Sequence, residues 1–82
     1  MDREQLLRRI TSDPKVMVGK PVIRGTRITV EHVLSELAGG VTVDELLEDF
    51  PYIERDDIYA VLAFAEEVMQ DVRLFEVRAG QP

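Results

Sequence analysis

The sequence contains no cysteine and no tryptophan, and it has a single histidine and two serines. Without cysteine there are no disulfide bonds, thiolate metal sites or thiol nucleophiles. The longest apolar run, residues 58–65, is far short of the ~20 residues that a helix needs to cross a bilayer. The first 13 residues mix charged with apolar side chains and have no apolar signal core. We therefore expect a cytoplasmic protein with no membrane segment.

The chain has 82 residues, of which 45% are hydrophobic and 32% charged. This balance is typical of a globular chain, and the length suits one small domain. We therefore treat residues 1–82 as a single domain.

The charges are divided unevenly along the chain. Residues 1–29 hold seven basic and three acidic side chains, which gives +4, whereas residues 30–82 hold three basic and thirteen acidic ones, which gives −10. Nucleic acid would contact the first third, because phosphates attract Lys and Arg, and a basic protein would contact the rest. The alternative is that both surfaces are merely solvated.

The N-terminal third is predicted to form a helix followed by a small β element. Residues 1–14 contain apolar side chains at helical spacing, and the helix should end at Asp13-Pro14, because a residue before proline avoids the α region. Residues 15–29 alternate β-forming residues with glycine and proline, which predicts two or three very short strands joined by turns, with Val16–Val18 as the first.

Three helices are predicted over residues 30–72. Thr29 would cap a helix from Val30 to Ala38, which ends at Gly39-Gly40, and residues 42–45 form a capping box for a short second helix. The third helix starts at Glu54 and continues to about Val72. Its predicted inward residues are Ile58, Val61, Leu62, Ala65, Val68, Met69 and Val72.

The predicted fold is therefore mainly α, a tri-helical helix-turn-helix (homeodomain-like or winged-helix-like) with a small N-terminal β element. Residues 73–82 form a tail, which could continue the helix, form a strand or dock on a partner.

Nothing in the sequence predicts catalysis or a bound metal. His32 has Ser35 and Glu36 nearby on its helix, but so small a domain offers little pocket for a nucleophile and its base. Adjacent acidic pairs on a helix diverge by about 100°, so they do not converge on a metal. We expect no enzyme activity, no catalytic residue, no metal and no cofactor.

The third helix is poorly suited to reading DNA bases. Its first residues, Glu54, Asp56 and Asp57, would repel phosphate, and the next eight are apolar on all sides. In so small a domain one apolar face should lack cover and form a protein interface. The residues expected there are Tyr59, Ala60, Ala63 and Phe64, with Phe75 of the tail. Alternatively, the tail or the N-terminal helix covers this face.

The turn region is the better candidate for contact with DNA. Lys20, Arg24 and Arg27 lie within eight residues, and their side chains could reach backbone phosphates. The alternative is that the two arginines hold the turns together by bonding carbonyls or acids.

The stretch from Gly19 to Ile28, GKPVIRGTRI, resembles the signature of domain-of-unknown-function family four-thirty-three, which is grouped with VapB-type antitoxins. Residues 10–14, the 30–37 helix, Gly39-Gly40, Phe50-Pro51 and residues 62–65 are also similar to that family. One departure is Glu54, where the family more often has a threonine or serine able to cap the third helix.

The resemblance implies a helix-turn-helix antitoxin of a type II toxin–antitoxin module. Its partner would be a PIN-type ribonuclease toxin, and the protein would also bind operator DNA. We expect a homodimer that neutralises the nuclease through its acidic, apolar C-terminal half. The alternatives are a stand-alone DNA-binding transcriptional regulator and a small structural adaptor.

Overall fold

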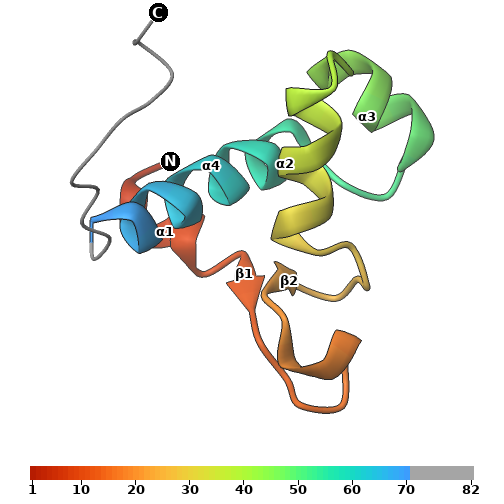
Figure 1. Ribbon diagram of the computed structural model, residues 1–82. Coiled ribbons are helices and arrows are strands. Elements are labelled where there is room, and N and C mark those ends of the chain that lie inside the picture. Colours follow the sequence, from red (N-terminus) through yellow and green to blue (C-terminus); the bar gives the residue numbers. More distant parts are fainter. Residues whose placement is uncertain (71–82) are drawn as a thin grey trace, which may run out of the picture.

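The computed structural model describes residues 1–70 of the chain, shown as a ribbon in Figure 1. The elements in chain order are α1 (Arg3–Leu7), β1 (Ile10–Thr11), the 3-10 turn η1 (Met17–Gly19), β2 (Val22–Ile23), α2 (Val30–Ala38), α3 (Val43–Asp49) and α4 (Arg55–Met69). Helices α2, α3 and α4 form the tri-helical unit, and α3 and α4 have the outline of a helix-turn-helix. The predicted fold class, mainly α with a small N-terminal β element, is confirmed.

Helices α2 and α3 begin where their capping residues predict. The Thr29 hydroxyl accepts a hydrogen bond from the His32 N–H at 3.0 Å, and α2 has the predicted bounds. Gly40 follows with φ 96°, a conformation that favours glycine. At α3, Thr42 accepts from the Glu45 N–H at 3.1 Å while the Glu45 carboxylate accepts from the Thr42 N–H at 3.0 Å. Local chemistry therefore sets both helix starts.

The N-terminal third differs from the prediction in two places. The helix spans only Arg3–Leu7, and Ile10 and Thr11 instead form β1, which pairs antiparallel with β2 in the register Ile10↔Ile23. Pairing with a buried strand places Ile10 against the core, which outweighs its helical spacing. The expected strand at Val16–Val18 is a tight turn, with both Met17 and Val18 at positive φ.

The core lies where α2, α3 and α4 meet β2. Its buried members are Ile23, Ile28, Val30, Val33, Leu46, Ile53, Ile58 and Val61. Every element except α1 and η1 contributes to this cluster or packs against it. Within residues 1–70, no helix has the length and apolar character that a membrane crossing requires.

Candidate interaction surfaces

Helix α1 covers part of the face of α4 that we predicted to be an interface. Ala60 is fully buried and Ala63 is 8% exposed. The guanidinium of Arg3 donates to the Ala63 carbonyl at 3.2 Å and pairs with Glu66 and Glu67 at 2.8 and 3.1 Å. Small side chains let the two helices approach closely, so the prediction that Ala60 and Ala63 form an interface is wrong.

The outward side of α4 instead carries Tyr59 and Leu62. Tyr59, a predicted interface residue, is 46% exposed. Leu62 was predicted to point inward but is 44% exposed, because it lies beside Tyr59 at the edge of the buried face to which Ile58 and Val61 belong. The predicted interface residue Phe75 lies outside the described residues, as does Val72.

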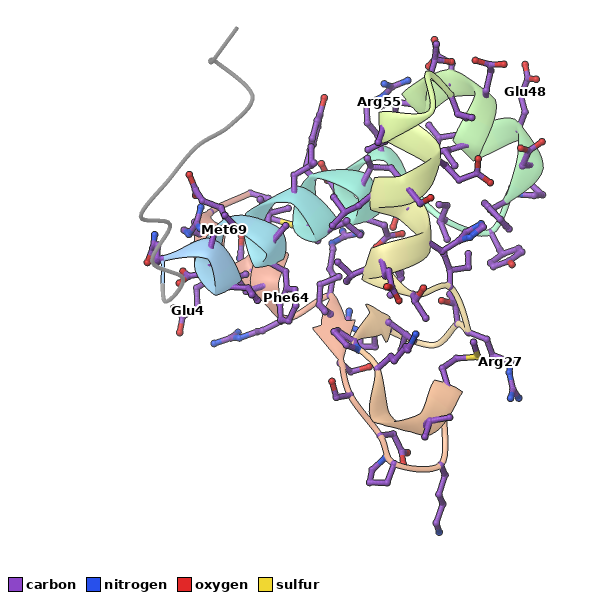
Figure 2. The ribbon with its side chains drawn as sticks, viewed as in Figure 1. Glu4, Arg27, Glu48, Arg55, Phe64 and Met69 are labelled. Carbon is purple, nitrogen blue, oxygen red and sulfur yellow. The ribbon has the colours of Figure 1, made fainter. Side chains whose placement is uncertain are left out.

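An apolar groove runs between α2 and the C-terminal half of α4. It has a volume of about 580 Å³. Its lining residues are Lys20, Pro21, Thr29, Val30, Glu31, Leu34, Phe64, Ala65, Val68 and Met69. Phe64 was predicted at an interface, and Figure 2 shows it with Met69 on this part of α4. We refer to this surface as the α2–α4 groove.

The sequence alone did not reveal the groove. Val68 and Met69 follow the core residues of α4 at helical spacing, so they were predicted to be buried, yet they are 49% and 51% exposed. Helix α2 crosses α4 at a steep angle, and α4 continues past the crossing (Figure 1). Within residues 1–70, the same face of α4 is therefore covered at its N-terminal end and exposed at Val68 and Met69.

Asp57 has a structural role that sequence reasoning missed. Its carboxylate accepts from the Arg9 guanidinium at 3.0 Å and from the Glu54 N–H at 2.8 Å. The side chain is nearly buried, and the bond to Asp57 raises the pKa of Arg9. Asp57 thus helps to start α4 and anchors the segment before β1.

Residues 13–28, which we call the basic lobe, form a tip around η1 that lies away from the helices and return to the core through β2 and Ile28 (orange to yellow in Figure 1). Lys15, Lys20, Arg24 and Arg27 are all exposed there, and residues 14–30 contain no acid. Lys20 pairs with Glu31 at 2.9 Å, a contact that lowers the pKa of Glu31. Among residues 1–70, no carboxylate lies within ion-pair distance of the other three cations.

The arginines differ in their involvement in the fold. Arg24 donates to the Arg8 carbonyl at 3.3 Å, so it contributes to holding the turn, as the alternative reading allowed. Arg27 extends into solvent (Figure 2). The turn is closed without Arg27 by Thr26, whose hydroxyl donates to the Ile23 carbonyl at 2.7 Å. Arg27 is therefore free to contact a ligand.

His32 and the acidic side chains of residues 1–70, the remaining candidates for a catalytic or metal site, are not arranged as one. His32 is half exposed, 3.4 Å from Glu36, with its ring against Phe50. In the part of the chain that the structure describes, no group of three or more histidine or acidic side chains is placed to hold a metal. The arrangement therefore supports binding to other molecules through the α2–α4 groove, the outward side of α4 and the basic lobe.

Fold and surfaces together define a small helix-turn-helix domain with a basic N-terminal lobe. Residues 10–65 match the family described as "Protein of unknown function (DUF433)", and the chain belongs to this family. It is also 37% identical over 57 residues to "Uncharacterized protein y4eO" of Sinorhizobium fredii. That match covers 70% of this chain but only 26% of the relative, so the chain spans about a quarter of that protein. No solved structure matches.

Proposed function

We propose that this protein is a VapB-type antitoxin that binds and neutralises a PIN-type ribonuclease toxin in the cytoplasm. The α2–α4 groove is the observation that carries the proposal. An exposed apolar groove on a small domain is typical of a protein-binding site, since burying apolar side chains supplies most of the free energy of association. The family resemblance suggests the toxin as the occupant.

The charge of the helical part favours the same occupant. Residues 30–70 contain eleven acidic residues and one arginine. A ribonuclease has to attract the phosphates of RNA, so the surface around its substrate site is basic. An acidic domain steers toward such a surface and competes there with RNA. Neutralisation then requires no catalytic group in the antitoxin.

Co-expression with the neighbouring toxin-like gene tests this function. The pair should co-purify and growth should be restored. Val68→Glu places a charge in the groove and should abolish both results. Tyr52→Glu is the control, because Tyr52 is an exposed apolar residue that lies outside the groove and outside the outward side of α4. Equal complex formation by wild type and Val68→Glu would contradict the proposed docking site.

The basic lobe supports a second activity, binding of operator DNA by which the protein regulates its own gene. Exposed cations on an acid-free segment suit phosphate contacts. Helix α4 does not suit recognition of bases, because its first turn carries Asp56 and Asp57 and its next turn is largely buried. We therefore assign the DNA contact to Lys20, Arg24 and Arg27, and Arg24→Glu with Arg27→Glu should abolish it.

We also propose a homodimer through the outward side of α4. Tyr59 and Leu62 offer a small apolar surface on one helix face. Light scattering on the purified protein should give twice the chain mass for the wild type and the monomer mass for Tyr59→Glu. A monomer mass for both proteins would contradict the proposed homodimer. It would not affect the proposed toxin contact, which uses the α2–α4 groove.

A further inference from the structure

The tip of the basic lobe exposes two apolar side chains on an unusual backbone. Val18 is 93% exposed and Met17 is 37% exposed. Their φ angles are 57° and 48°, and Gly19 follows at 78°. The left-handed region is a genuine outlier for a β-branched residue such as valine. A strained residue that contributes nothing to its own core indicates a function for the tip.

Hydrogen bonds between residues close in the sequence hold this tip in place. The Val16 N–H donates to the Asp13 carbonyl at 2.8 Å, and the Lys20 N–H donates to the Met17 carbonyl at 3.1 Å. The Asp13 carboxylate also accepts from the Lys15 N–H at 2.9 Å. The turn therefore presents Val18 in a defined position.

Three cations line the same hollow as the two apolar side chains. A hollow of about 520 Å³ lies beside the tip. Its lining residues are Pro14, Lys15, Met17, Val18, Lys20, Arg27 and Thr29. Cations beside an exposed apolar tip suit a ligand that is anionic outside and apolar inside. A DNA duplex is such a ligand, because its charged backbones flank stacked bases.

We infer that Val18, supported by Met17, is a wedge that enters the DNA minor groove and unstacks a base step while Lys15, Lys20 and Arg27 contact the flanking phosphates. Architectural DNA-binding proteins insert apolar side chains in this way. The inference rests on the DNA contact proposed above and adds the residue that deforms the duplex. Flexible pyrimidine–purine steps are the preferred targets, because they unstack most easily.

An anionic bilayer is also charged at its surface and apolar inside, but the tip is too small to attach to one. Stable attachment to a membrane needs a large apolar face or a lipid chain. The lobe offers only Met17 and Val18 as exposed large apolar residues. Unstacking a base step needs only one side chain, so the geometry favours DNA.

The test uses the full-length protein and duplexes of about 30 base pairs that tile the DNA upstream of its own gene, with 2-aminopurine at TA steps. Anisotropy reports affinity, and 2-aminopurine fluorescence rises when its base unstacks. Wild type should bind with a rise in fluorescence. Val18→Gly should bind about tenfold more weakly, since a buried valine side chain contributes roughly that much, and should lose the rise.

Three controls separate the wedge from the other parts of the protein. Glycine adopts positive φ readily, so Val18→Gly should unfold at the wild-type temperature or above it. Arg27→Gln should reduce the slope of log affinity against log salt by about 0.9 and keep the fluorescence rise. Tyr52→Ser, which alters another exposed apolar residue, should change neither measurement.

Each contrary outcome has a distinct meaning. Failure of the wild type to bind any duplex at low salt overturns both the DNA contact and the wedge. Equal binding by Val18→Gly, with no fluorescence rise in either protein, overturns the wedge alone. Val18-dependent binding to phosphatidylglycerol vesicles without binding to DNA overturns the inference in favour of a bilayer. Toxin neutralisation by Val18→Gly, measured in parallel, should stay at the wild-type level.

Discussion

Two arginine–aspartate pairs of the same chemistry have very different surroundings. Arg9 and Asp57 have side chains that are 17% and 12% exposed, and Asp57 also accepts from the Glu54 N–H. Arg55 and Asp44 pair at the surface, with exposures of 49% and 78%. Water and salt screen the second pair, whereas removal of Asp57 leaves the partly buried Arg9 guanidinium with only the exposed Glu54 carboxylate at 3.3 Å and leaves the Glu54 N–H without its partner.

Asp57→Ala should therefore lower the free energy of unfolding by about 2 kcal/mol. The matched surface variant, Asp44→Ala, should change it by no more than about 0.5 kcal/mol. Urea unfolding followed by circular dichroism measures both values. Similar losses in the two variants would show that burial of the Arg9–Asp57 pair has no energetic consequence.

At the scale of elements, short helices depend on the groups at their ends. Helix α3 has seven residues and a single fully buried side chain, Leu46. Its capping box therefore matters more than it would for a long helix. The Glu45 carboxylate accepts from the Thr42 backbone, which lowers the pKa of Glu45.

This lowered pKa predicts a pH-dependent contribution to stability. A carboxyl whose pKa is lower in the folded state stabilises the protein above its unfolded-state pKa and loses that contribution as pH falls through the folded-state value. Glu45→Gln keeps a capping side chain that does not titrate. Thermal unfolding should show the wild-type advantage over Glu45→Gln at pH 7 and a smaller advantage at pH 3. A constant difference across that range contradicts the role of the ionised carboxylate.

The packing of α1 on α4 is the other decisive feature at this scale. Ala60 is fully buried one turn before Ala63, which α1 contacts through Arg3, whereas its neighbour Tyr59 is 46% exposed. Ala60→Leu should force the helices apart and cost about 1–3 kcal/mol of stability. Tyr59→Leu should be nearly neutral. The midpoints of denaturant unfolding measure the stability of both variants. An unchanged midpoint for Ala60→Leu would mean that α1 does not cover this face in solution.

At the scale of the whole molecule, the two charge classes occupy different regions. The basic lobe lies on one side of the core, whereas Glu48 and the other acids of α3 lie at the far end of the molecule (Figures 1 and 2). The α2–α4 groove opens along the C-terminal half of α4 and borders the lobe only through Lys20 and Pro21. One domain thus presents separate surfaces for an anionic and an apolar partner.

This separation predicts that the two proposed activities can be removed independently. Arg24→Glu with Arg27→Glu should abolish DNA binding and leave toxin neutralisation unchanged, because neither residue lines the groove. Val68→Glu should have the opposite effect. Anisotropy with duplex DNA and growth on toxin expression measure the two activities in the same set of variants. Loss of both activities in either well-folded variant would show that the surfaces are coupled.

Much of the fold could be predicted because the helical part is determined by local signals. Thr29, the Thr42–Glu45 pair and Gly39-Gly40 mark helix ends through hydrogen bonds within a few residues. The candidate site was predicted in part. Lys20, Arg24, Arg27 and Tyr59 are exposed as expected, but Ala60 and Ala63 are not. Burial of an alanine depends on which distant segment packs on it, and the helical spacing of α4 does not encode that.

The amino-acid sequence by itself determined the boundaries of α2, the start of α3, the presence of a small N-terminal β element and the segregation of charge, because caps, turns and composition act over short distances. Tertiary structure alone decided that Ile10 joins a strand, that α1 packs on α4 at Ala63 and that Val68 and Met69 are half exposed in the groove among residues 1–70. These three outcomes depend on the angle at which helices cross and on contacts between residues far apart in the chain. The same geometry places Val18 at the exposed tip of the basic lobe.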